Sequence, residues 1–327
     1  MRKLIYIFLL LASSFAKGQE QLPIYNQYLF GSYFLINPAV AGIDNVWKVQ
    51  MTHRQQWVGM EDAPSTQSIA GEGQLFNNFK VGGYLFMDKN GYHKQNGYQF
   101  AVSYTLKLDN ERTSLRRLSL GLAYSGSNKF IDKTDLADIN DPVFIVGDYN
   151  IFNHNASFGA FMMWDGFYAG LAGSHLLSGG YEQNPTDYTN SFFPRNYNAI
   201  VGWKIKQSRD FYIEPSVMLR VIENYDTHLD LNAKFYYVPA YARRINAGYW
   251  IGASYRTSWE EFPLRSLSVS AFVGGSYKDF YYGYSYEVMT DKYQGYHTGS
   301  HQLMIGYTLS LKADRKCGCT PFSIPVL

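Results

Sequence analysis

The chain has 327 residues with a formal net charge of +2, and aromatic and charged residues each make up 17%. Hydrophobic residues account for 46%, yet the mean hydropathy is −0.25. This composition excludes an intrinsically disordered chain, which needs few aromatics and many charges, and 2 cysteines are too few for a disulfide scaffold. Beyond the N-terminus no apolar run is as long as a membrane helix, which needs about 20 residues, so a helical membrane protein is excluded. The class that remains is a Tyr- and Gly-rich, all-β protein.

Residues 1–18 are typical of a signal peptide. Two basic residues precede an apolar run over residues 4–11, and small residues follow, with plausible cleavage after Ala16 or Gly18. We therefore expect an exported protein. Cleavage after Gly18 removes three of the 29 basic residues and leaves 26 against 27 acidic residues, so nucleic acid is not an expected partner.

Residues 19–46 form an N-terminal segment that precedes the first strand and is rich in aromatic residues. Leaving those side chains in water would be costly, so some surface must cover them. One interpretation is a plug packed inside the fold that the later strands form, and the other is a docking site for a periplasmic partner; the two are compatible. Asn37 precedes Pro38 and should be extended or in a turn, and Gly42 permits positive φ or close backbone approach.

From Trp47 onward apolar and polar residues alternate with period two, which places one kind of residue on each face of a strand. Residues 98–108 are an example, with apolar or aromatic even positions and small or polar odd positions. The predicted strands cover 47–57, 65–75, 79–88, 97–108, 115–127, 152–164, 167–175, 196–206, 210–222, 228–237, 241–255, 265–276, 280–288 and 298–311. About fourteen strands, an even number, is typical of outer-membrane barrels and places both chain ends in the periplasm.

A soluble sandwich would share the alternation, but strand and loop lengths favour the barrel. Strands of about ten residues suit a tilted membrane strand and exceed the usual 5–6. Aromatic residues near strand ends, such as Trp57, fit interfacial girdles. Connections alternate between short ones, such as 165–166, and longer ones, such as 89–96 and 128–151, as periplasmic turns and surface loops do. We therefore predict an antiparallel transmembrane β-barrel over residues 47–311 in the outer membrane.

Residues 312–327 follow the last strand as a periplasmic tail. A disordered end and a contact arm that uses Phe322 are both compatible with the sequence. Cys317 and Cys319 lie in this tail in an oxidising compartment. A strained local disulfide, a bond to a partner and a free pair are the alternatives for these two thiols.

Strand parity places five charged residues on the face that lines the lumen: Glu214, Arg220, Asp230, Lys234 and Arg256. Opposite charges on neighbouring strands can pair there, either to brace a closed lumen or to line a pore. Charges facing lipid would cost about 2–4 kcal/mol near the midplane, so inward placement is expected under either interpretation. A single-chain pore of this size would be narrow, which favours a filled interior.

No motif indicates catalysis or a bound cofactor. The chain lacks the zinc-protease, nucleophile-elbow and Walker patterns, and His297 and His301 are too far apart on one strand face for an obvious shared metal. An acidic loop over residues 132–141 offers oxygen ligands for Ca²⁺ but lacks the EF-hand spacing, so a solvated loop is favoured. We therefore expect no cofactor, no metal and no enzymatic activity.

A set of short motifs follows in order along residues 25–67. They are Y-N-Q-Y at 25–28, N-P-A-V-A-G at 37–42, H-R-Q-Q-W-V-G at 53–59 and A-P-S-T-Q at 63–67. With these motifs the chain resembles the PorP/SprF family of outer-membrane proteins, linked to the type IX secretion system and gliding machinery of Bacteroidetes. Later similarities, such as E-P-S at 214–216, extend the resemblance over essentially the whole mature chain, and His53 departs from the aromatic residue usual in the family.

The resemblance implies a non-enzymatic barrel that works with type IX secretion components and supports secretion or surface attachment of a partner, often a very large adhesin. The candidate partner contacts are Asn37, Pro38, Gly42, Arg54, Trp57, Pro64 and Phe322. An alternative is a fatty-acid-transporter type of barrel for hydrophobic small molecules, which has no evident need of these motifs. An outer-membrane hydrolase is the third hypothesis, and it lacks a readable Ser/His/Asn-like set.

Overall fold

The computed structural model describes most of the chain. The described residues are 25–30, 32–44, 46–76, 78–108, 116–131, 150–177, 194–223, 227–239, 247–259, 265–290 and 298–309. The predicted signal peptide, the acidic loop, the tail with Phe322 and both cysteines lie outside them. In the described part of the chain, no helix is long and apolar enough to cross a membrane.

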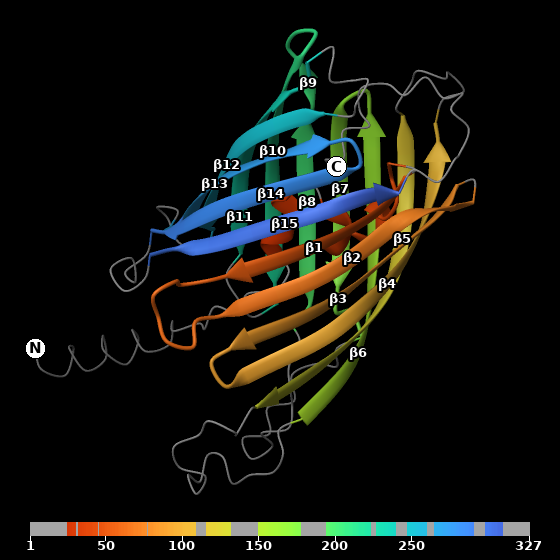
Figure 1. Ribbon diagram of the computed structural model, residues 1–327. Helices are drawn as coiled ribbons and strands as arrows, with labels where there is room; N and C mark the ends of the chain where they lie inside the picture. The colour runs from red at the N-terminus through yellow and green to blue at the C-terminus, as the bar shows by residue number, and fades with distance from the viewer. Residues whose placement is uncertain are drawn as a thin grey trace, which may run out of the picture.

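The strands form a closed antiparallel β-barrel (Figure 1). Neighbours in the chain pair with each other, and β15 pairs with β1, which closes the sheet. The strands are β1 Trp47–Gln55, β2 Ser65–Phe76, β3 Phe79–Asn90, β4 His93–Lys107, β5 Arg117–Ile131, β6 Asn150–Trp164, β7 Phe167–Ser174, β8 Asn196–Trp203, β9 Ile205–Lys206, β10 Phe211–Ile222, β11 His228–Tyr237, β12 Gly248–Ser258, β13 Arg265–Tyr277, β14 Phe280–Met289 and β15 Ser300–Leu309.

β8 and β9 are two parts of one strand, so the barrel has fourteen strands, and the predicted fold is confirmed. Both parts pair with β10 in one register, with Gly202 opposite Ser216 and Ile205 opposite Ile213. Pro215 lies opposite Trp203, the last residue of β8 before the gap at Lys204, and proline has no backbone N–H to donate to a neighbouring strand. The interruption is therefore a missing hydrogen bond rather than an inserted residue.

Polar side chains point into the barrel and apolar side chains point out. On β1, Lys48, Thr52 and Arg54 are buried, whereas Met51 is 57% exposed. On β5, Leu122 is 69% exposed while its neighbour Ala123 is buried. A soluble sandwich would bury the apolar face instead, so this inversion is the pattern expected of a barrel whose outer surface faces lipid.

The two ends of the barrel differ in their connections. At one end β6 and β7 are joined by Asp165-Gly166, both with positive φ, as a tight two-residue hairpin requires. β1 also begins and β15 also ends here, and we call this the short-turn end. The opposite end, which we call the loop end, carries the β1–β2 connection over residues 56–64.

The predicted loop over residues 89–96 is wrong. β3 and β4 continue to a turn at residues 91–92, with Asn90 opposite His93. Residues 93–96 are polar on both faces, so the alternation that marks a membrane strand is absent although the backbone ladder continues. β5 likewise extends to Ile131, beyond the predicted end at residue 127.

Residues 28–30 and 32–43, which we call the plug, fill part of the barrel interior (Figure 1). They belong to three 3₁₀ helices, η2 Tyr25–Phe30, η3 Tyr33–Leu35 and η4 Pro38–Val40, and to the turns between them. All of these side chains are buried, and Tyr33 and Phe34 are at most 2% exposed. With inward-facing wall residues such as Tyr84 and Phe272 they form the hydrophobic core.

Candidate functional site

Asn37 fastens the plug to one side of the barrel. Its Nδ2 donates to the backbone carbonyls of Ala160 on β6 and Leu171 on β7, each at 3.2 Å. Its Oδ1 accepts a hydrogen bond from the Ala39 N–H at 3.0 Å and so caps η4, with Pro38 in the first turn. The N-P-A-V-A-G motif therefore builds an interior anchor.

Glycines in the wall allow the plug to come close. A Cβ at Gly159 on β6 would lie 1.9 Å from Asn37 Oδ1, and one at Gly121 on β5 would lie 2.3 Å from the Ala39 nitrogen. Real Cβ atoms essentially never make contacts this short, so a side chain at either position would displace the plug. The wall and the motif are therefore matched in shape at this point.

Gly42 ends the plug in a left-handed conformation with φ 64°. Its N–H donates to the Glu72 carboxylate on β2 at 2.7 Å, and a Cβ at Gly42 would lie 2.6 Å from the Gly73 carbonyl oxygen. Both the backbone angle and the space require glycine here. The next residue, Ile43, accepts a hydrogen bond from Lys80 at 3.3 Å, so a buried acid and a buried base hold the end of the plug.

A chain of buried charges holds the other side of the plug. Arg256 donates twice to Asp230, at 2.8 and 3.1 Å, from directly across the β11–β12 ladder. The plug contributes Tyr28, whose hydroxyl donates to Asp230 at 2.7 Å. Arg256 also lies 3.5 Å from Glu287 on β14, which accepts from Arg54 on β1 at 2.6 Å. Such charge-assisted hydrogen bonds are strong, and each buried charge here has a partner.

Glu214 on β10 is the centre of a second buried cluster. Four wall side chains contact its carboxylate: Tyr236 at 2.7 Å, Tyr168 at 2.8 Å, and Lys204 and Lys234 at 3.9 Å. The plug contributes Tyr33, whose hydroxyl lies 3.4 Å from Glu214. Burial and the nearby carboxylate raise the pKa of the Tyr33 phenol well above its usual range, so it remains a hydrogen-bond donor at neutral pH.

The predicted lumen charges all lie in the interior. Glu214 sits opposite Lys234 and Asp230 opposite Arg256 in neighbouring strands, and both pairs make contact. Arg220 is 1% exposed and donates through Nε to Asn198 at 3.2 Å. In the described interior four of these charges form two pairs, whose acids Glu214 and Asp230 also contact the plug, while Arg220 contacts the Asn198 amide.

The candidate partner contacts divide into two groups. Asn37, Pro38, Gly42 and Arg54 are buried and contact the barrel or the plug rather than the surface. Trp57 and Pro64 lie in the β1–β2 connection at the loop end, where Pro64 is buried and its carbonyl accepts the Gln56 N–H at 2.8 Å. Phe322 lies outside the described residues.

Trp57 and its neighbours form a rim at the loop end. Trp57 has φ 48°, which is unusual and strained for a bulky residue, and its Nε1 donates to the Met289 sulfur at 3.2 Å. The next residue, Val58, exchanges backbone hydrogen bonds with Gly299 and Thr298, each at 2.9 Å. The β1–β2 connection is thereby held against the β14–β15 connection, and we call residues 56–60 the rim.

Sequence reasoning missed several members of the interior site. Glu287 has the parity of inward-facing Gly283 and Ser285, but tyrosines occupy both faces of β14 and hide the alternation. Lys204 continues the parity of inward-facing Asn196 and Asn198, so the sequence carries a signal for it that the prediction did not use. Tyr28 was recognised as an aromatic that needed cover, but nothing local in the sequence indicates Asp230 as its partner.

The interior residues fill the barrel and pair its buried charges. In the ranges that the structure describes, no group of three or more His, Cys, Asp or Glu side chains could hold a metal ion. The buried acids contact arginines, lysines, phenols and backbone N–H groups. What these residues do chemically is fix the plug in the barrel.

The family model described as the type IX secretion system membrane protein PorP/SprF matches residues 17–307. Among solved structures, the chain is similar to the CymD monoaromatic hydrocarbon channel, with 8% identity over 85% of this chain and 91% of that one and a TM-score of 0.49. It is also similar to a Pseudomonas aeruginosa FadL homologue, with 11% identity over 85% of this chain and 93% of that one and a TM-score of 0.49. A third similar structure is the Ralstonia pickettii toluene transporter TbuX, with 10% identity over 85% of this chain and 93% of that one and a TM-score of 0.48. Identities this low concern the fold alone. Comparison with curated proteins gives no match.

Proposed function

The chain belongs to the PorP/SprF family of type IX secretion system membrane proteins, and we propose that it is a non-enzymatic barrel supporting secretion or surface attachment of a partner protein such as a large adhesin. The family match over residues 17–307 carries this proposal. A β-barrel of this family points to the outer membrane. We propose further that residues 1–18 are removed on export and that the short-turn end, with both chain ends, faces the periplasm.

The rim supports an attachment role. Trp57 is held in a strained conformation at the loop end, opposite the end at which β1 begins and β15 ends, and strain of this kind tends to occur where function requires it. Arg54 lies three residues earlier and pairs with Glu287, two residues before the Trp57 contact Met289. In our proposal Trp57 forms the docking surface, the buried Pro64 supports it by accepting the Gln56 N–H, and Arg54 positions it from inside the barrel.

The plug residues take part indirectly. Asn37, Pro38 and Gly42 fix the plug, and the plug in turn contacts both buried charge clusters. We propose that they keep the barrel closed and shaped while the partner is docked, and that Phe322 in the tail is a further contact on the periplasmic side. Transport of hydrophobic small molecules has less support, because an apolar solute would have to displace the plug and pass buried charges.

The experiment compares surface display in the source bacterium. The chromosomal copy is deleted and replaced by the wild type, by Trp57→Ala, or by Trp164→Ala, which removes an exposed tryptophan of the short-turn end. Surface proteins are identified by protease shaving and mass spectrometry, and barrel folding is checked by heat-modifiable gel migration.

We expect the deletion and Trp57→Ala to lose the same type IX partner from the surface and from pull-downs, with Trp164→Ala like the wild type. If display is intact in the deletion strain while uptake of hydrophobic solutes is lost, the transport alternative is correct instead.

A further inference from the structure

Three cations meet at the short-turn end of the barrel, where the plug ends, and we call them the basic cluster. Lys80 on β3 and Arg117 on β5 both donate to the carbonyl oxygen of Ile43, each at 3.3 Å, so their charges lie side by side. Lys107 is the last residue of β4, lies directly opposite Arg117 and is within electrostatic reach of Lys80. Like charges in such positions repel one another, so the arrangement favours a bound anion.

The acids at the end of the plug have other partners. Asp44 pairs with Lys48, and Glu72 accepts the Gly42 N–H at 2.7 Å. Among the residues that the structure describes, no carboxylate forms an ion pair with any member of the basic cluster. The cluster therefore carries more positive charge than its described surroundings neutralise.

The basic cluster faces the lumen and its mouth rather than the lipid. The neighbouring residues Leu106 and Leu118 form the outward-facing pair of the same two strands, so the next pair, Lys107 and Arg117, faces inward. Lys80 is 2% exposed, Arg117 is partly buried and Lys107 is exposed. The cluster thus extends from the plug to the edge of the barrel, where a group from the aqueous phase can reach it. A lipid headgroup lies on the other side of the wall.

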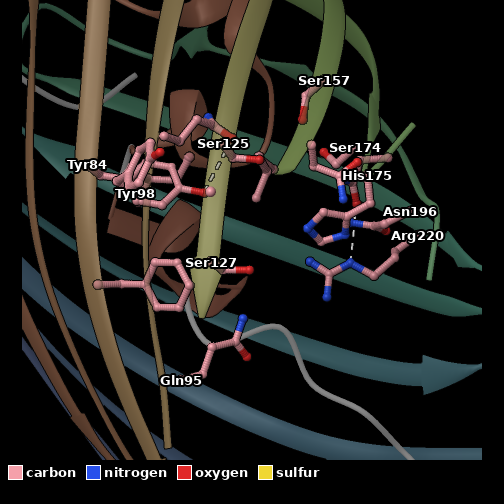
Figure 2. A pocket seen from close by; sticks show the side chains of 17 residues that line it. Tyr84, Gln95, Tyr98, Ser125, Ser127, Ser157, Ser174, His175, Asn196 and Arg220 are labelled. Carbon is pink, nitrogen blue, oxygen red and sulfur yellow. Dashed lines mark hydrogen bonds between the residues drawn. The ribbon is translucent and has the colours of Figure 1, made fainter. Parts of the chain in front are cut away.

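The buried arginine of the loop-end half is in a different situation. Arg220 donates through Nε to Asn198 at 3.2 Å and borders a polar cavity of about 60 Å³ (Figure 2). Such a cavity holds about five water molecules, since each needs about 10–15 Å³ of such space. Amide and water groups suffice for Arg220, whereas the basic cluster is open to a partner.

We propose that the basic cluster is a docking site for an acidic segment of a periplasmic protein. Arg117 suits a carboxylate in charge and geometry, and Lys107 adds a second positive charge beside it. One anion on a partly exposed cation gains at most about 1 kcal/mol. Stable occupation therefore requires several carboxylates on one chain, because the later contacts are intramolecular once the first has formed. This inference rests on the proposed function, in which the short-turn end faces the periplasm, and it adds the chemistry of the partner on that side.

The test is titration of the purified full chain in detergent with fluorescein-labelled hexaglutamate, and hexaglutamine is the uncharged control peptide. We expect hexaglutamate to bind at least about tenfold more tightly than hexaglutamine and to bind more weakly as salt rises, because exposed charges are screened. Equal binding of the two peptides overturns the proposal.

Two competitors test other sources of negative charge. Displacement of hexaglutamate by inorganic phosphate, but not by acetate at the same ionic strength, assigns the cluster to phosphate instead. Displacement by micelles of phosphatidylglycerol, but not of phosphatidylcholine, assigns it to a lipid surface. We expect neither competitor to act beyond its contribution to ionic strength.

Variants locate the binding site. Lys107→Gln should weaken hexaglutamate binding about threefold to fivefold, and the double variant with Arg117→Gln should weaken it at least about tenfold. Lys107→Gln alters an exposed residue and remains informative should the double variant fail to fold. Lys278→Gln is the control, since it removes an exposed cation from the β13–β14 turn at the same end. Equal weakening by Lys278→Gln would show attraction to the whole end and overturn the proposal.

Two acids of this chain compete with an external partner. Asp109 and Glu111 belong to the β4–β5 connection, outside the described residues. If Asp109→Asn with Glu111→Gln tightens hexaglutamate binding at least about tenfold, that connection is the occupant and the proposal is overturned; we expect less than about a threefold change. The titration depends on neither orientation nor display. Its failure overturns this inference alone, and intact display in the deletion strain overturns the proposed function alone.

Discussion

The plug meets the two sides of the barrel by different means. Toward β5 to β7 it contacts glycines and backbone carbonyls, so the fit is one of shape and of Asn37 hydrogen bonds. Toward β10 to β12 it meets carboxylates through the hydroxyls of Tyr28 and Tyr33. A larger side chain on the β5 to β7 side should therefore destabilise the protein, and so should removal of a charge on the β10 to β12 side. Each expectation can be tested by one isolated change.

The largest effect is expected on the charged side. Asp230→Asn keeps the size of the side chain but leaves Arg256 buried without its main counter-ion. Removing one partner of a buried pair typically costs about 3–5 kcal/mol, and we expect a loss of this size in the free energy of unfolding. The measurement is urea-induced unfolding of the barrel in lipid vesicles.

The matched control for Asp230→Asn is Asp165→Asn. Asp165 pairs with Arg116 at 2.9 Å, but the two side chains are 45% and 38% exposed. An exposed pair contributes at most about 1 kcal/mol, so this variant should unfold almost as the wild type does. Equal losses in the two variants would show that the interior charges are screened by water and do not hold the plug.

The next effect is expected on the shape side. Gly121→Ala places a Cβ 2.3 Å from the backbone nitrogen of Ala39, which cannot move without the whole turn. Overpacking of this kind costs about 1–3 kcal/mol, and we expect η4 to lift from the wall and become accessible to protease. Gly71→Ala is the control, because its Cβ would have no neighbour nearer than 3.7 Å. Protease resistance of η4 in Gly121→Ala would contradict the close fit.

The barrel was predictable from the sequence because each strand faces two environments. On β1 the apolar Met51 is exposed on the outer face and the polar Thr52 is buried on the inner face, and this alternation repeats with period two. The same parity indicated that Glu214, Asp230 and Arg256 face inward. Where the strands leave the apolar band, as at residues 93–96, both environments are polar and the signal vanishes.

The plug could be suspected but not built from the sequence. Its side chains are buried all round, so no periodicity indicates which residue meets which strand. Asn37 contacts Ala160 and Leu171, more than 120 residues away in the chain. Such pairings depend on closure of the whole barrel, and a single sequence carries no local pattern that records them.

A smaller effect is expected from the anchor itself. Asn37→Ala removes the cap of η4 and two hydrogen bonds to strand carbonyls. Since a net hydrogen bond contributes about 0.5–1.5 kcal/mol and the carbonyls retain their places in the sheet, we expect a loss of about 1–2 kcal/mol. Hydrogen exchange at the Ala39 amide should report it, and Asn90→Ala, at the exposed last residue of β3, should leave it unchanged. An unchanged exchange rate at the Ala39 amide would mean that the close packing of η4 on Gly121 and Gly159 is enough to hold it.

The smallest effect, and one of opposite sign, is expected at Pro215, which lies opposite Trp203 at the edge of the interruption between β8 and β9. The Lys204 N–H donates to the Gly166 carbonyl at 2.8 Å, on the side of β7. Backbone groups of successive residues point to opposite sides of a strand, so those of Trp203 point to β10, where Pro215 is the facing residue. Pro215→Val restores an N–H there and should raise the free energy of unfolding by about 1 kcal/mol. Val217→Ile, on the same outward face, adds no hydrogen bond and should have no effect. If Pro215→Val gives no gain, the interruption is maintained by the buried Lys204–Glu214 contact, and the wall at this point is shaped by the charged interior rather than by proline.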